Sequence, residues 1–153
     1  MFFRRKSSAA PNDNPIADGM GRLPIWYRAM EGDLVGVARS IADGEDVQNT
    51  DTKGFSVLHV ACEYGHREVA QALIAAGADA NAVDRHGNSP LWAATRNASQ
   101  GLYEPGIVAD LLAAGASATH VNKAGRAPPC WADERPAIQA LYRTAGYQGN
   151  FKS

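Results

Sequence analysis

The chain has 153 residues, a typical length for one domain, and its content of 45% apolar and 20% charged residues is ordinary for a soluble globular protein. A formal net charge of -1 gives no reason to expect nucleic acid or a membrane surface as a partner. No run of 18 apolar residues occurs in the sequence, which excludes a conventional membrane-spanning helix.

The N-terminus and the cysteines favour a cytoplasmic protein. Residues 1–6 place their basic side chains after two phenylalanines, and no apolar stretch follows, unlike in a secretory signal. The two cysteines, Cys62 and Cys130, fall within apolar helical patterns. We expect both to be buried free thiols, which suit a reducing compartment.

An internal repeat dominates the sequence. An aspartate recurs every 33 residues and a glycine follows it three positions later, in the pairs Asp18 and Gly21, Asp51 and Gly54, and Asp84 and Gly87. The next copy begins 38 residues after Asp84, at Asn122, so the third copy contains an insertion of five residues. We therefore predict four repeats at 18–50, 51–83, 84–121 and 122–147, between an N-terminal tail at 1–17 and a C-terminal tail at 148–153. The N-terminal tail is rich in Ser, Pro, Asn and Asp, and we expect it to be disordered.

The second copy shows the expected order of elements most clearly. Asp51 and the glycine three residues later have the chemistry of a turn. Ser56 is a suitable N-cap for a first helix, which Gly65 would end. A second helix is predicted from about Arg67 to Ala76, where apolar residues form one stripe before a glycine.

The third copy follows the same order but contains the insertion. Ser89 and Pro90 are typical of a helix cap and a first-turn proline. We place the insertion at residues 97–106, between the two helices and on the edge away from the turns. Leu102 and Tyr103 within it either cover the core or contact a partner, and the sequence does not decide between these alternatives.

The first and last copies depart from the pattern. Arg28 occupies a place that is small in the other copies, and residues 44–48 differ from the Gly-Ala-Asp signature at 77–79. In the last copy, residues 127–130 lack the Ser cap, and the link between helices near 134–136 is short. A single hairpin cannot bury its apolar face, so repeats of this kind stack, and the terminal ones are atypical because each covers one end of the core.

These motifs resemble the ankyrin repeat. The stretches that carry the resemblance are residues 54–61 (Gly-Phe-Ser-Val-Leu-His-Val-Ala), 77–82 (Gly-Ala-Asp-Ala-Asn-Ala), 87–94 and 115–118. The resemblance covers about residues 18–145. It implies an all-α solenoid of about four helix-turn-helix repeats, in which the turns project as short β-hairpin-like fingers and the first helices line a concave face. It also implies that His59 is structural and bonds to neighbouring turns.

No catalytic, cofactor-binding or metal-binding residues are predicted, and we do not expect an enzyme. The four histidines lack metal-ligand spacing, and the glycines follow the repeat period instead of forming a phosphate loop. Ser56 and Ser89 are better explained as helix caps than as nucleophiles, which would need a nearby base. Three tryptophans, Trp26, Trp92 and Trp131, are better explained by packing than by a ligand cage.

The predicted partner-binding residues lie around the turn glycines and at the ends of the first helices. They are Met20, Arg22, Thr52, Lys53, Phe55, Glu63, Tyr64, Arg85, His86, Asn88, Arg96, Lys123 and Arg126. The turn positions include five Lys or Arg residues and no acidic one, although the turn aspartates offset part of this charge. Aromatic and long apolar side chains among them would anchor a partner. The alternative is a solvated row of turns that binds nothing.

The predicted function is a protein-protein interaction module that binds the acidic face of another protein and masks or tethers it. We expect a monomer or a 1:1 heterocomplex that consists of little besides this domain. A more specific hypothesis is a bacterial immunity protein that neutralises a toxin. The alternative is a nucleic-acid-binding module that uses the basic turns, which would require phosphate contacts and a steep salt dependence.

Overall fold

The computed structural model describes residues 16–152, so most of the tail predicted at 1–17, and Ser153, lie outside the described residues. The described part contains the helices α1 (Pro24–Glu31), α2 (Leu34–Ala42), α3 (Val57–Glu63), α4 (Arg67–Ala75), α5 (Pro90–Ser99), α6 (Gly106–Ala113), η1 (Pro128–Ala132) and α7 (Pro136–Thr144). No β-strand occurs in residues 16–152, where Thr50 and Ser56 form an isolated bridge. The predicted all-α solenoid is confirmed.

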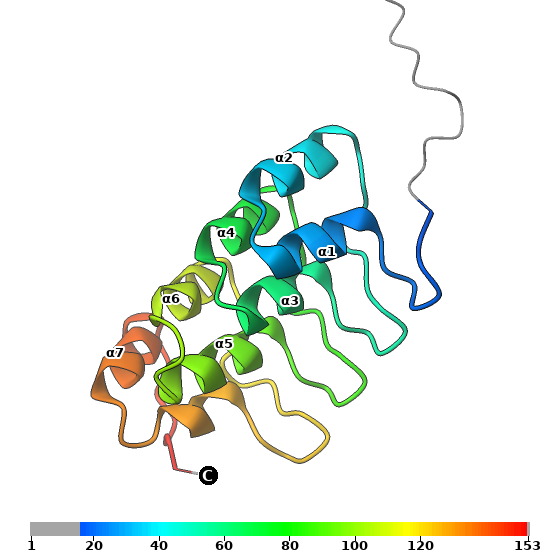
Figure 1. Ribbon diagram of the computed structural model, residues 1–153. Helices are drawn as coiled ribbons and strands as arrows, with labels where there is room; N and C mark the ends of the chain where they lie inside the picture. Colours follow the sequence, from blue (N-terminus) through cyan, green and yellow to red (C-terminus); the bar gives the residue numbers. More distant parts are fainter. Residues whose placement is uncertain (1–15, 153) are drawn as a thin grey trace, which may run out of the picture.

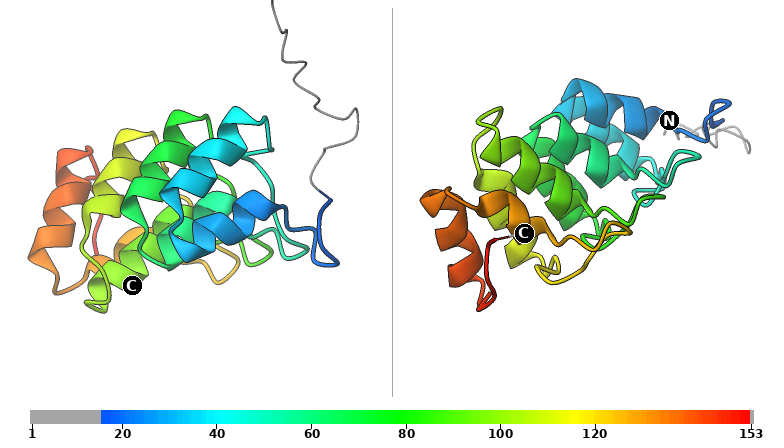
Figure 2. Two further views of the ribbon diagram at one scale, coloured as in Figure 1. Left: turned by 45° about the horizontal axis from the view of Figure 1, so that its top comes forward. Right: turned by 90° about the horizontal axis from the view of Figure 1, so that it is seen from below.

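The helices form two parallel rows (Figure 1). α1, α3, α5 and η1 follow one another in the inner row, and α2, α4, α6 and α7 in the outer row. The turns that precede the inner helices all project from the same side of the stack, as Figure 2 also shows from two other directions. This arrangement places the turns and the inner helices on one continuous surface.

Local capping explains where the inner helices begin. The Ser56 hydroxyl accepts a hydrogen bond from the backbone N–H of His59 at 3.1 Å, and His59 Nδ1 accepts one from the backbone N–H of Ser56 at 3.2 Å, which completes a capping box. In α5, Ser89 accepts from the N–H of Trp92, and Pro90 occupies the first helical position. Both predicted caps are therefore confirmed.

The core runs along the stack between the two rows. Leu58 and Leu91 of the inner row and Leu73 and Leu111 of the outer row are all essentially inaccessible to solvent. His59 is also fully buried, and its Nε2 lies 2.8 Å from the carbonyl oxygen of Asn88 in the next turn. The predicted structural role of His59 is confirmed, because this contact joins adjacent repeats.

Two predictions about the later repeats need correction. Cys130 is partly exposed, because the last copy replaces the first α-helix with the 3-10 helix η1 and leaves one side of that helix uncovered. The insertion is not wholly between helices. Since α5 has 10 residues against 7 in α3, residues 97–99 extend this helix, and Asn97 and Ser99 are buried.

Each end of the stack has its own covering. At the first repeat, the two departures from the pattern contact each other, because Arg28 Nη1 lies 3.2 Å from Glu45 Oε1. Both side chains also bond the buried hydroxyl of Ser40. At the other end, Phe151 folds back onto Tyr142 of α7 and is buried, with ring centroids 6.1 Å apart.

Candidate functional site

The four turns share one internal geometry. We call them the fingers, and they comprise residues 18–22, 51–55, 84–88 and 122–126. In the second finger, Asp51 Oδ1 accepts hydrogen bonds from the backbone N–H groups of Lys53 at 2.8 Å and Phe55 at 2.9 Å. The first residue of each other finger makes the equivalent pair of bonds. The recurrent aspartate is thus a turn former, as the sequence predicted, and Asn122 replaces it without loss of these bonds.

Backbone hydrogen bonds join successive fingers into a ladder. The donor is the second residue of one finger and the acceptor is a carbonyl of the preceding finger, in the pairs Thr52 to Met20 (2.9 Å), Arg85 to Lys53 (2.9 Å) and Lys123 to His86 (3.0 Å). The fingertips are therefore fixed relative to one another before any partner arrives.

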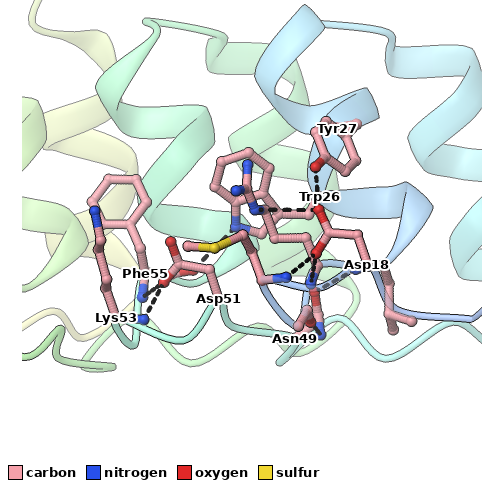
Figure 3. A network of polar contacts seen from close by, with 11 residues as sticks. Asp18, Trp26, Tyr27, Asn49, Asp51, Lys53 and Phe55 are labelled. Carbon is pink, nitrogen blue, oxygen red and sulfur yellow. Dashed lines mark hydrogen bonds and ion pairs between the residues drawn. The ribbon is translucent and has the colours of Figure 1, made fainter.

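Side chains from the inner helices form hydrogen bonds with the fingers (Figure 3). The Trp26 indole donates to the carbonyl oxygen of Phe55 at 3.1 Å, which links the first repeat to the second finger. The Tyr27 hydroxyl donates to Asp18. That bond and the backbone N–H groups of Arg22 and Met20 lower the pKa of Asp18 below its usual value.

Six of the predicted fingertip residues are exposed and make no ion pair within residues 16–152. They are Thr52, Lys53, Arg85, His86, Lys123 and Arg126. Four of the six are Lys or Arg, so the exposed row has an excess of positive charge.

Four other predicted finger residues are half-buried, so less of each side chain is available to a partner. Arg22 lies 4.8 Å from the centre of the Trp26 ring and pairs with Asp18. Phe55 is half-buried and packs on the ring of His59. The side chain of Asn88 accepts a hydrogen bond from Asn122 at 2.8 Å. Met20 is also half-buried.

The predicted residues at the ends of the inner helices neutralise one another. Arg96 Nη2 of α5 lies 2.6 Å from Glu63 Oε2 of α3, and Asn97 donates to the Glu63 carbonyl at 2.9 Å. Tyr64, the residue that follows Glu63 in the sequence, is 46% exposed. This part of the inner surface therefore presents an exposed aromatic ring, while the charges of Arg96 and Glu63 compensate each other.

The tryptophans pack in the stack. Trp26 and Trp92 are buried, and Trp92 meets Trp131 edge to face with centroids 5.6 Å apart. Within residues 16–152, no three His, Cys, Asp or Glu side chains gather as metal ligands would, and no helix is long and apolar enough to cross a bilayer. Burial raises the pKa of the Cys62 thiol strongly, which suppresses the reactive thiolate.

Known proteins share the repeat. Residues 41–91 match a family model described as ankyrin repeats (many copies). An ankyrin repeat-containing protein of Schizosaccharomyces pombe is 31% identical over 68 residues, which cover 44% of this chain and 33% of that protein. Protein phosphatase 1 regulatory subunit 27 of Homo sapiens is 34% identical over 70 residues, covering 46% of each chain. Neurogenic locus notch homolog protein 2 of Homo sapiens is 44% identical over 55 residues, covering 36% of this chain and 2% of that protein. The chain thus spans less than half of each of these relatives, and its fold is an ankyrin-repeat solenoid.

Proposed function

We propose that this protein binds another protein through its fingers and the adjacent inner helices. The observation that carries the proposal is the ladder of backbone hydrogen bonds, which fixes the backbone positions from which a row of exposed Lys and Arg side chains projects. A pre-ordered surface loses less conformational entropy on binding than a mobile one. Exposed cations in such a row attract a partner of opposite charge and increase its association rate.

The chemistry of the described residues favours binding over catalysis. His59, which could otherwise act as a base, is buried and bonded to Ser56 and Asn88. The turn aspartates use their carboxylates on backbone N–H groups. The similarity to a protein named as a phosphatase regulatory subunit is consistent with a role that operates through a partner.

The partner that best fits this surface is a protein with an acidic face of about 800 Å². A 1:1 complex in the cytoplasm that masks the partner or tethers it is the form of the proposal that we favour. Its most specific version is an immunity protein that covers the active surface of a toxin. The row of fixed cations supports the acidic partner, and the reduced cysteines are compatible with the cytoplasm.

The test is a charge reversal on the fingers. Lys53, Arg85 and Arg126 are changed together to Glu, and a control carries the same change at Arg39, Arg135 and Arg143, which are exposed on or next to the outer helices α2 and α7. Both variants have the same net charge and should keep the helical circular dichroism of the parent, because none of the six side chains is buried.

The readout is recovery of a stoichiometric partner from native lysate at low salt. We expect the finger variant to lose the partner and the control to keep it. If both variants retain the partner equally, the finger surface is not the site. A gel shift with nucleic acid separates the alternative, because retention of DNA or RNA with a steep salt dependence would replace a protein partner by a nucleic acid.

A further inference from the structure

The edge opposite the fingers carries exposed apolar side chains. It is formed by the loops that join the inner and outer helices, and we call residues 64–68 and 100–105 the loop edge. Three large apolar side chains on it are exposed, namely Tyr64 at 46%, Leu102 at 59% and Tyr103 at 40%. Two of the three belong to the insertion, so the extra residues of the third repeat add apolar surface to the edge on which Tyr64 of the second repeat also lies.

The aromatic rings on this edge are held in place. The Tyr103 ring covers Gly65 so closely that a Cβ atom at Gly65 would lie 2.4 Å from Cγ of Tyr103. The Tyr64 ring is nearly parallel to the His66 ring, with centroids 6.4 Å apart. His66 is itself fixed by a 2.9 Å contact between its Nε2 and the carbonyl oxygen of Met30. The rings therefore form a preset surface instead of a mobile loop.

A hollow of about 590 Å³ lies beneath the insertion. Its lining includes Gly65, Glu68, Leu102, Tyr103, Glu104 and Ile107. This volume is large enough for one long side chain of a partner and part of its neighbour. Leu102, Tyr103 and Ile107 contribute apolar surface to its wall, and Glu68 and Glu104 contribute carboxylates.

The charge of the hollow is negative. Arg67 also lines it, but its guanidinium is paired with Asp110, with Nε and Oδ2 2.8 Å apart, so the arginine is already neutralised. Glu68 and Glu104 are both exposed, and neither takes part in an ion pair within the described part of the chain. The loop edge thus has the opposite sign from the exposed finger row.

We propose that this hollow binds a Lys or Arg side chain of the partner protein, together with an apolar residue next to it. A cation is attracted both by carboxylates and by the face of a tyrosine ring, and its aliphatic stem packs on apolar walls. Leu102 and Tyr64 would receive the neighbouring apolar residue. The inference rests on the proposed binding function and adds to it a second contact, of opposite sign, on the other edge.

Such a pair of edges would orient the partner. An acidic region of the partner would face the fingers and a basic-apolar region would face the loop edge, because the reversed orientation places like charges together. Because the two edges lie on opposite sides of the stack, binding at the loop edge can be measured separately from binding at the fingers.

The experiment is an NMR titration of the whole chain with the peptide acetyl-Gly-Leu-Arg-Gly-amide. The matched control peptide has citrulline in place of arginine, which keeps the shape and removes the charge. We expect the arginine peptide to shift the backbone amides of Gly65, Leu102 and Glu104, and to bind about three- to fivefold more tightly than the citrulline peptide, as exposed ion pairs allow.

Variants test the assignment to the loop edge. The pair Glu68→Gln and Glu104→Gln should remove the preference for arginine, and Leu102→Ala should weaken both peptides. The control pair Glu31→Gln and Val35→Ala makes similar changes at exposed positions of the first repeat and should leave binding unchanged. The Lys53, Arg85 and Arg126 finger variant should also bind the peptide normally, so failure of the finger proposal and failure of this one are separate results.

Three outcomes would overturn the inference. They are equal affinity for the two peptides, shifts that map to another surface, and no saturable shift at the loop edge. Sedimentation of the chain alone tests whether a second copy of the chain occupies the loop edge. An oligomer that Leu102→Ala dissociates would show that a second copy binds there instead of another protein.

Discussion

The contact between Arg28 and Glu45 predicts a strong energetic coupling at the first repeat. Glu45 is nearly buried and accepts three bonds, from the backbone N–H of Ile25 at 2.9 Å, from Ser40 Oγ at 2.9 Å and from Arg28. Replacing Glu45 with Ala removes all three acceptor contacts. It leaves Arg28, which is only 33% exposed, without a carboxylate to balance its charge, although its bond to Ser40 remains possible.

The magnitude follows from these losses. A hydrogen bond to a charged group contributes about 1.5–3 kcal/mol, and a buried polar group left without a partner costs about 1–3 kcal/mol. Because these losses overlap in one network, we expect Glu45→Ala to lower the free energy of unfolding by ~3 kcal/mol. With a urea dependence of about 2 kcal/mol per molar, the midpoint should fall by about 1.5 M.

Arg28→Ala should cost less, about 1 kcal/mol, since Glu45 keeps its bonds to Ile25 and Ser40. The double variant places Ala at both positions, as in the second repeat at Ala61 and Ala78. We expect it to be more stable than the sum of the single changes by ~1–2 kcal/mol, because no unpaired charge remains. Urea unfolding followed by circular dichroism measures this cycle, with Arg39→Ala as an exposed control. Additive effects would refute the reasoning.

Three further predictions concern the core, the buried histidine and the thiols. Leu58→Ala and Leu91→Ala should each lower the free energy of unfolding by ~2–5 kcal/mol by leaving a cavity, and an unchanged urea midpoint would contradict the packing described. Burial lowers the pKa of His59 below its usual 6.5, so the unfolded chain binds a proton at this residue more readily than the folded chain does. The stability that depends on neutral His59 should be fully present above about pH 6.5 and should fall as the pH decreases, by at most ~1.4 kcal/mol per pH unit. Urea midpoints measured across pH should show this slope in the parent chain, and His59→Gln should remove it. Of the thiols, partly exposed Cys130 should react with a disulfide reagent in the folded chain and Cys62 only after unfolding, so rapid reaction of both would place Cys62 at the surface.

The sequence predicted the parts of this fold that depend on local chemistry. The helix caps at Ser56 and Ser89 and the turn at Asp51 are formed by residues close together in the sequence. Their positions could therefore be predicted once the repeat of 33 residues was recognised. The role of His59 followed from the family resemblance and is confirmed by its contact with Asn88.

The parts that the sequence did not predict depend on contacts between distant residues. Arg28 and Glu45 were each recognised as unusual, but their pairing requires α1 and the loop after α2 to meet in space. The burial of Phe151 against Tyr142 likewise follows from a tail folding back onto α7, for which no periodic signal exists. For Arg22, the nearby aromatic residues Trp26 and Tyr27 were a usable signal, since a cation four or five residues away can stack on such rings.

The candidate surface was only partly predictable for the same reason. Exposure at Lys53 and Arg85 follows from their place at a fingertip, whereas the hollow at the loop edge arises only when the insertion folds over Gly65. The sequence therefore located the extra residues but left open whether Leu102 and Tyr103 cover the core or contact a partner, and the structure shows that both side chains are exposed.

The hydrogen-bonded ladder between the fingers has a consequence for how this surface can change. The bonds that fix each tip run through backbone atoms and through the first residue of the turn, and none requires the side chain of Thr52, Lys53, Arg85 or Lys123. Those side chains can therefore be exchanged without rebuilding the turn beneath them. Specificity can diverge one tip at a time, while the scaffold that presents the tips keeps its stability.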